Sequence, residues 1–369
     1  MVSLPKILVL TISHPWCDSR VYFKVIGSLC KKKVQILLYT GNKQNSNYIK
    51  CYPNFAYTII RSSHKLSLLL QMIIKGFRYR PDIIICIEPL SLIAGLFLKK
   101  ILSCRLIYDC HEYYAEAARE EKKIYSSFYW KVESFLASKT DAILTVNLHL
   151  SKKFTPLQKN TFECSNLPLR EVFLTTQQVY PREYDLIYVG GISFARGLKI
   201  FLETINLFKK HQKTIKFCLI GIFQNRTTEE FFFNFLKINQ LNDYIIYKPF
   251  LPNNLIYEEI RKAKLGIFLG DLKLAARYNQ SISMKVFEYF TQKTPVIINQ
   301  LEMLGEMVKI SQGGWIIEYD SQELFLLLRS ILGDEQLLRL KGEQGFNYTI
   351  KNYVWEKQES ILYAAIFGN

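Results

Sequence analysis

Several patterns that define common protein classes are missing from this sequence of 369 residues. The eight cysteines form no CxxC pair, which argues against a zinc site and favours reduced, buried thiols. No acidic DxD pair is present, so we expect no metal ligands. The longest apolar stretch, Ile83–Leu98, contains Glu88 and Pro89 and is therefore predicted to form a strand, a loop and a helix rather than a membrane span.

The opening segment MVSLPKILVLTISH places one lysine before a short apolar run, and Asp18 and Arg20 follow soon after it. This arrangement predicts a first strand rather than a signal peptide, and with it a cytoplasmic location. The length of the chain favours two domains over one. Hydrophobic residues make up 49% of the chain, which argues against disorder.

The net charge of +16 is concentrated in the first half of the chain. Residues 1–170 carry 25 Lys and Arg against 11 Asp and Glu, whereas residues 171–369 carry 23 against 21. A basic face attracts phosphates or anionic lipid headgroups, although it can also serve solubility alone. An expected apolar helix, Leu66–Phe77, suggests a contact with the membrane surface, and the alternative is a helix that packs on the core. Its basic flanking residues are Lys65, Lys75, Arg78 and Arg80.

Strands and helices are expected to alternate through the first half, which predicts a doubly wound parallel sheet. The expected strands are Lys6–Ile12, Val34–Tyr39, Tyr57–Ile60, Ile83–Ile87, Arg105–Tyr108 and Ala142–Val146. The expected helices are Val21–Cys30, Leu66–Phe77, Leu90–Ile101 and Phe128–Ser138. The polar clusters HPWCDSRV and DCHE directly follow strands, at the sheet edge where open α/β sheets bind ligands. A structural and a catalytic role are both consistent with His111 in the second cluster.

A second doubly wound sheet is expected after a linker at Thr175–Tyr184. The predicted domains are residues 1–175 and 176–350, and residues 351–369 are predicted to form a closing helix that crosses back to the first domain. The expected strands of the second sheet are Asp185–Val189, Ile215–Ile220, Tyr244–Tyr247, Leu265–Leu269 and Pro295–Ile298. Gly190 and Gly191 follow the first of these strands and let the backbone approach a ligand closely. Arg196, near the start of an expected helix, can clamp a diphosphate through two contacts.

The stretch Asn279–Val296 predicts a nucleotide site on a helix with a defined start. Ser283 is a plausible N-cap, with Lys285 in the first turn and Glu288 one turn later. A helix N-terminus offers N–H groups and a partial positive charge to a phosphate, and a carboxylate can accept two hydrogen bonds from a ribose diol. The alternative is an ordinary packing helix with a solvated glutamate.

Five sequence blocks occur in the order that they have in the group 1 (family 4) glycosyltransferases: HPWCDSRV, YDCHE, DAILTVN with the later SNLP, YVGGISFARG and SMKVFEYFTQKTPVI. The whole chain therefore resembles a GT-B glycosyltransferase, and this resemblance implies two Rossmann-like domains that face a central cleft. It also implies a retaining transfer without a metal or other cofactor, from a nucleoside-diphosphate sugar of the UDP or GDP type. The first domain would bind the acceptor and the second the donor.

The resemblance also assigns roles to single residues. Glu288 matches the family glutamate that holds the ribose, Arg196 stands where a cation neutralises the diphosphate, and His111 matches a histidine over the donor sugar. The predicted catalytic residues are His111, Arg196 and Lys285. The predicted donor-binding residues are Gly190, Gly191, Asn279, Gln280, Ser283, Met284 and Glu288. The predicted acceptor-binding residues are His14, Asp18 and Arg20.

Three positions depart from the family pattern. The second family cation falls on Gly191, and Lys285, in a slot often held by proline, is predicted to replace it. The first glutamate of the paired family motif falls on Gln280, whose amide can bond to sugar hydroxyls but carries no charge. The loop with two glycines that is common after the first strand is replaced by Ser13-His14-Pro15.

The leading hypothesis is a transferase that builds a surface glycan on a lipid-linked acceptor, bound peripherally to the anionic inner face of the membrane. A non-catalytic partner subunit is an alternative because of Gln280. A nucleotide-sugar epimerase would need carboxylates that face the sugar, and no such set is recognised. A nucleic-acid-binding protein would use the basic half, but no motif of that class is recognised and no nucleic-acid partner is predicted.

Overall fold

The computed structural model describes residues 4–43, 52–114, 126–174, 181–249, 251–280 and 282–368. The chain divides into two compact units, of which the first is Met1–Asn166 with Trp355–Asn369 and the second is Leu167–Val354. This boundary lies before the predicted one at residue 175. Most of the predicted linker, residues 175–180, lies outside the described residues.

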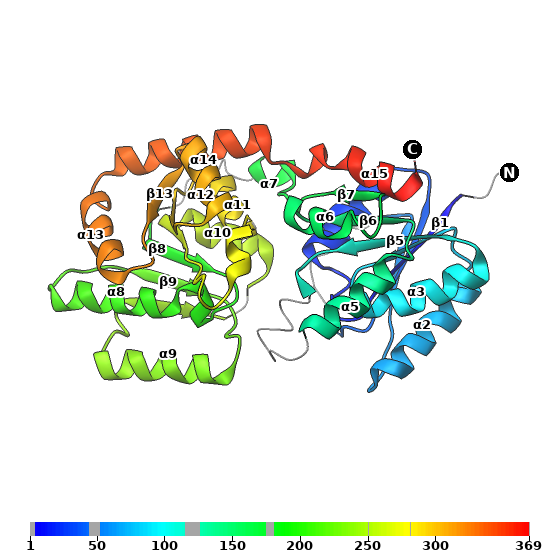
Figure 1. The fold of residues 1–369 in the computed structure, drawn as a ribbon. Helices are drawn as coiled ribbons and strands as arrows, with labels where there is room; N and C mark the ends of the chain where they lie inside the picture. Colours follow the sequence, from blue (N-terminus) through cyan, green and yellow to red (C-terminus); the bar gives the residue numbers. More distant parts are fainter. Residues whose placement is uncertain are drawn as a thin grey trace. The chain divides into compact units, whose positions relative to one another are not determined.

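The first unit contains a parallel sheet of seven strands in the order β3-β2-β1-β4-β5-β6-β7 (Figure 1). The strands are β1 (Lys6–Thr11), β2 (Gln35–Thr40), β3 (Phe55–Ile59), β4 (Ile83–Cys86), β5 (Arg105–Cys110), β6 (Ala142–Thr145) and β7 (Thr161–Glu163). Nearly every residue of β1 and β4 is buried, as expected of central strands that are covered on both faces. The strand order reverses between β1 and β4, so the switch point lies at their carboxyl ends.

Helices cover both faces of this sheet. The core on one face includes residues of α2 (Lys65–Tyr79), α3 (Pro89–Leu102), α5 (Ser126–Ala137) and α6 (Leu148–Phe154). The single helix predicted at Val21–Cys30 is instead a π-helical segment, η1 (Ser19–Ile26), that continues into α1 (Gly27–Leu29).

The C-terminal segment belongs to the first unit. It consists of η5 (Trp355–Lys357) and α15 (Glu359–Phe367), and it follows α14 (Glu335–Asn352) of the second unit. Trp355 Nε1 donates a hydrogen bond to Ser28 Oγ at 2.8 Å, and Ser28 Oγ donates to Glu359 at 2.8 Å. These bonds join the end of the chain to the helical segment that follows β1.

The second unit contains a parallel sheet of six strands in the order β10-β9-β8-β11-β12-β13. The strands are β8 (Tyr184–Val189), β9 (Phe217–Ile220), β10 (Ile245–Lys248), β11 (Ala263–Phe268), β12 (Val296–Asn299) and β13 (Gly314–Ile317). The helical segments of this unit are α7 (Arg170–Leu174), η3 (Phe194–Arg196), α8 (Leu198–Lys210), α9 (Arg226–Asn239), α10 (Asn253–Arg261), η4 (Ala276–Gln280), α11 (Met284–Thr291), α12 (Glu302–Ser311), α13 (Ser321–Ile331) and α14. Here the switch point lies between β8 and β11.

The prediction of two doubly wound parallel sheets is confirmed. The helix α8 begins shortly after Arg196, where a helix was expected, and α11 begins directly after the predicted N-cap Ser283. The strands β7 and β13 were not predicted because they are short edge strands without a continuous buried run. In the part of the chain that the structure describes, no helix combines the length and the apolar content needed to cross a bilayer.

Candidate active site

Glu88 fixes the loop after β1 at the switch point of the first sheet. Its buried carboxylate accepts hydrogen bonds from Thr11 Oγ1 at 2.7 Å and from the backbone N–H groups of Ile12 and Ser13 at 3.0 and 2.8 Å. A carboxylate with several donors holds these groups in one geometry. This role was missed from the sequence, although a charged residue directly after a buried strand is a signal that could have revealed it.

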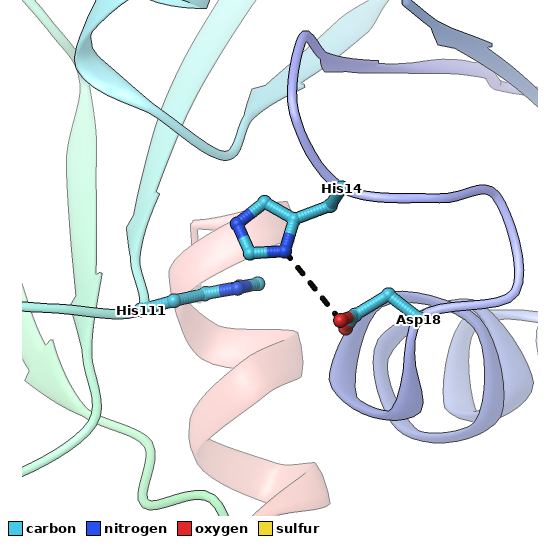
Figure 2. A group of neighbouring side chains, drawn as sticks. All are labelled: His14, Asp18 and His111. Carbon is cyan, nitrogen blue, oxygen red and sulfur yellow. Dashed lines mark ion pairs between the residues drawn. The ribbon is translucent and has the colours of Figure 1, made fainter. Parts of the chain in front are cut away.

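His14, Asp18 and His111 lie next to one another at this edge of the sheet (Figure 2). Asp18 caps the start of η1 by accepting hydrogen bonds from the backbone N–H groups of Arg20 and Val21. Its carboxylate faces His14 Nδ1 at 3.5 Å, and the ring centroids of His14 and His111 are 5.4 Å apart. The structure therefore brings two predicted acceptor residues together with one predicted catalytic residue.

Arg20 has a different place from the one predicted. Its side chain is 3% exposed, and Nη2 donates to Asp109 Oδ1 at 2.8 Å while Nη1 donates to the carbonyl of Cys164 at 2.9 Å. Asp109 Oδ2 lies 2.8 Å from His111 Nε2. The Arg20 guanidinium is thus enclosed by the unit itself, which argues against its predicted contact with an acceptor. Arg20 instead holds Asp109, which in turn orients His111.

The charged forms of His14 and Asp18 stabilise each other. Burial alone would lower the pKa of His14, but the carboxylates of Asp18, Glu88 and Glu112 raise it to about 9. Burial would raise the pKa of Asp18, yet its hydrogen bond with His14 and the charges of both histidines hold that pKa well below its ordinary value. His14 is therefore a cation and Asp18 an anion at neutral pH.

The same three side chains could also hold a metal ion. One ligand atom from each of His14, Asp18 and His111 lies within 4.8 Å of the others. Two imidazoles and a carboxylate are a ligand set that Zn²⁺ accepts. A metal-bound histidine often has a carboxylate on its other ring nitrogen, as His111 has Asp109 on Nε2. The ion pair between His14 and Asp18 accounts for the same arrangement, and the metal-free reaction stays a prediction.

Two cations lie against consecutive glycines at the switch point of the second sheet. Gly190 has a φ of 129°, and a Cβ built on it would lie 1.9 Å from Lys285 Cε. A Cβ on Gly191 would lie 2.5 Å from Arg196 Nη1. The absence of side chains at these glycines therefore makes the space in which the two cations sit.

Arg196 and Lys285 are held by different means. Arg196 Nε donates to the hydroxyl of Tyr278 at 3.1 Å, and its Nη1 donates to the carbonyl of Gly191 at 3.2 Å. Lys285 is in the first turn of α11, where burial and the neighbouring Arg196 lower its pKa to about 8 against the opposing effect of Glu288. Two neighbouring cations at a strand end form a site that favours an anion with more than one charge.

The remaining predicted donor residues divide into two groups. Ser283 occupies the N-cap of α11, where its side chain caps no N–H group, and Met284 and Glu288 are partly buried on that helix. Gln280 ends η4 and is also partly buried. Asn279, by contrast, accepts a hydrogen bond from the backbone N–H of Glu302 at 2.7 Å and donates to its carboxylate at 3.0 Å. These bonds commit the Asn279 amide to the start of α12, which argues against its predicted donor role.

The sequence of the second unit matches a known family. Residues 174–348 match the family described as glycosyl transferases group 1. The match covers most of the second unit. This match confirms the resemblance inferred from the sequence, and it covers Arg196, Lys285, Glu288 and both glycines. Among curated proteins, none gives a significant match.

Solved glycosyltransferase structures match this chain along nearly its whole length. Sucrose-phosphate synthase from Thermosynechococcus elongatus has 14% identity and a TM-score of 0.71, with 96% of each chain covered. HepE of Anabaena in complex with UDP-glucose has 12% identity and a TM-score of 0.71, with 97% of this chain and 98% of that chain covered. The lipopolysaccharide outer core galactosyltransferase WaaB, in its apo form, has 13% identity and a TM-score of 0.61, with 98% and 99% covered. At such identities the likeness shows the fold, and it confirms the predicted GT-B class.

Proposed function

We propose that this protein transfers a sugar from a nucleoside-diphosphate sugar to an acceptor. The observation that carries the proposal is the pair Arg196 and Lys285, which lies against two glycines where an open parallel sheet binds ligands. Cleavage of the donor leaves a diphosphate oxyanion, which both cations and the start of α11 would stabilise. Glu288, one turn into the same helix, would accept hydrogen bonds from the ribose. The complexes of HepE with UDP and with UDP-glucose support this type of donor.

The proposed transfer retains the anomeric configuration. The bond between the sugar C1 and the phosphate oxygen breaks, and the nucleoside diphosphate leaves with the electron pair. The acceptor hydroxyl oxygen bonds to C1 on the same face, and its proton passes to the departing phosphate oxygen. His111, oriented by Asp109, would contact the sugar during this step. Arg196 and Lys285 would supply the positive charge that a divalent ion supplies in other transferases.

The proposed acceptor is a glycan or a lipid-linked saccharide in surface polysaccharide synthesis, with the protein bound to the inner face of the membrane. The first unit carries 25 Lys and Arg against 13 Asp and Glu, whereas the second carries 23 against 19. A basic unit is suited to a phosphate-bearing acceptor at an anionic surface. His14 would add a cation that can donate to phosphate or sugar oxygens, and Asp18 an anion that can accept hydrogen bonds from sugar hydroxyls.

Ligand-induced stabilisation tests the donor proposal. The melting temperature would be measured with UDP, GDP, UDP-sugars and GDP-sugars, and with ATP and NAD as controls. A specific nucleoside diphosphate at 100 times its dissociation constant should stabilise the fold by about 2.7 kcal/mol. Hydrolysis of the matching nucleotide sugar, with the product anomer identified by NMR, would then establish the reaction. If no nucleoside diphosphate stabilises the protein and no sugar is released, the proposal fails and the non-catalytic alternative raised by Gln280 gains support.

A further inference from the structure

Three neighbouring helices of the first unit are apolar on their outer sides as well as towards the core. The helices α2, α3 and α5 lie side by side along the sheet (Figure 1), and α3 contacts both of the others. Each buries residues in the same core cluster. A surface helix normally presents polar residues to water on its opposite face. On these helices the outward positions also hold large apolar side chains, so the outer surface departs from that pattern.

The exposed apolar residues form rows with helical spacing. The row on α2 is Leu66, Leu70, Ile74 and Phe77, the row on α3 is Ile93, Phe97 and Ile101, and the row on α5 is Phe128, Val132 and Phe135. Their exposed fractions range from 39% to 70%. Residues three or four apart lie on one side of a helix, so each row is continuous. We name these three rows, together with the basic residues around them, the α2–α3–α5 face.

Basic residues flank the rows. They are Lys65, Lys75, Arg78 and Arg80 on and after α2, Lys99 and Lys100 on α3, and Lys131 and Lys139 on and after α5. Among the described residues of these three helices, no carboxylate is exposed, because Glu133 is 2% exposed and bonds to the hydroxyl of Tyr108. Lys99 pairs with Asp141, which follows α5. The α2–α3–α5 face therefore combines apolar rows with positive charge.

The helix α9 of the second unit shows a different pattern of exposed residues. Phe233 and Ile238 are also exposed on α9, but Glu229 and Glu230 lie on the same helix. Mixed charges around single apolar residues are ordinary for a soluble surface, whereas contiguous exposed rows mark an interaction site.

We propose that the α2–α3–α5 face docks on an anionic lipid bilayer. Its apolar rows would enter the interface between headgroups and acyl chains, and its Lys and Arg side chains would bind the headgroup phosphates. The α2–α3–α5 face would make the membrane contact of the proposed function. The purpose of this contact rests on that function, whereas binding to the bilayer does not. Docking against a second copy is disfavoured, because a symmetric contact would place the same basic residues against one another. Nucleic acid would engage the cations but would leave the rows of aliphatic side chains in water.

Vesicle co-sedimentation of the full chain tests this proposal. We expect binding to phosphatidylcholine vesicles that contain phosphatidylglycerol, weaker binding to phosphatidylcholine alone, and weaker binding at higher salt. The charge variant is Arg78→Glu/Lys100→Glu/Lys131→Glu, and its matched control in the second unit is Lys199→Glu/Lys213→Glu/Lys237→Glu. Each basic residue near an anionic surface changes membrane partitioning by about fivefold. The charge variant should therefore weaken partitioning by roughly 100-fold or more. The control should bind as well as the unaltered protein.

The apolar rows are tested by Phe97→Ser/Phe135→Ser, with Phe233→Ser/Ile238→Ser as the matched control. All four positions are exposed, so the variants should keep the melting temperature of the unaltered protein. We expect the first variant to lose binding and the control to keep it.

Three results would overturn the proposal: no sedimentation with phosphatidylglycerol vesicles at low salt, equal losses in the variants and their controls, or a dimer that Phe97→Ser/Phe135→Ser converts to a monomer. Stabilisation by UDP and GDP, measured in parallel, separates this outcome from that of the donor site. A protein that binds vesicles but no nucleoside diphosphate would refute the proposed function alone.

Discussion

The two units share one architecture but differ in how charge is arranged at their switch points. In the first unit, charged groups face partners of opposite sign, as in the pairs of Arg20 with Asp109 and of His14 with Asp18. In the second unit, the cations Arg196 and Lys285 lie close enough for one to lower the pKa of the other. The first arrangement stabilises the empty site, whereas the second is stabilised when an anion binds. This contrast favours the second unit as the place where the proposed diphosphate would bind.

The largest effect is expected from breaking a buried pair of the first unit. Asp109→Asn would leave the Arg20 guanidinium enclosed without its carboxylate, which should cost about 3–5 kcal/mol of unfolding free energy. Denaturant unfolding measures this change. Asp141→Asn is the matched control, because its pair with Lys99 is partly exposed and should contribute about 1 kcal/mol or less. Similar losses in both variants would show that the Arg20–Asp109 pair has no special role in the first unit.

Removal of a cation from the second unit should act on the reaction rather than on stability. Arg196→Ala should lower kcat by about 100-fold or more, and by more than it weakens donor binding, because the leaving oxyanion loses a preorganised donor. Steady-state kinetics with the donor identified by the thermal screen would measure both quantities. Lys199→Ala removes an exposed cation from the next helix and should leave the rate unchanged. A change in KM alone would show that Arg196 serves only binding.

Glu288 tests the nucleoside part of the same site. Glu288→Ala should weaken binding of the nucleoside diphosphate by about 2–3 kcal/mol, since a carboxylate with two hydrogen bonds is lost. Isothermal titration calorimetry gives the dissociation constant directly. The exposed Glu306 on the neighbouring helix α12 provides the control Glu306→Ala. Equal affinity in the Glu288 variant and the unaltered protein would remove this residue from the donor site.

Local signals in the sequence were sufficient for the central strands and for several of the residues directly after them. Apolar runs predicted β1 and β4, and the apolar stretch Leu66–Phe77 predicted a helix where the structure has α2. His111 was singled out because the motif DCHE directly follows a strand. These features depend on neighbours in the chain, which is why a single sequence reveals them.

The partners of the site residues depend on contacts between distant segments. Arg20 meets Asp109 from 89 positions away, Glu88 meets Thr11 from 77, and Arg196 meets Tyr278 from 82. No periodicity or motif records such pairs in one sequence, so Arg20 was assigned to the acceptor although its charge is used inside the unit. The pairing of Asn279 with Glu302 was missed for the same reason.

A smaller effect should appear in the pH dependence of nucleotide binding. The pKa of Lys285 is lowered to about 8, so the lysine is largely protonated below that pH and increasingly neutral above it. Since the cation attracts the diphosphate, affinity should be constant below about pH 8 and should fall above it, by at most about tenfold per pH unit. In Lys285→Met this fall should disappear, and the affinity should be lower at neutral pH. A fall that persists in the variant would assign the titration to another group.

The smallest effect is expected from removal of metal ions. If Arg196 and Lys285 supply the charge that stabilises the leaving diphosphate, EDTA should leave kcat unchanged. The cluster of His14, Asp18 and His111 makes this a strict test, because its ligand atoms are spaced closely enough to hold an ion. Zinc added after EDTA removal should compete with the proton on His14, so any binding should weaken as the pH falls below about 9. Loss of activity in EDTA, with rescue by zinc and no rescue in His14→Asn, would show that a metal ion in the first unit supplies the positive charge that the reaction needs. Loss with rescue by Mg²⁺ or Mn²⁺ would instead show that Arg196 and Lys285 do not suffice in the second.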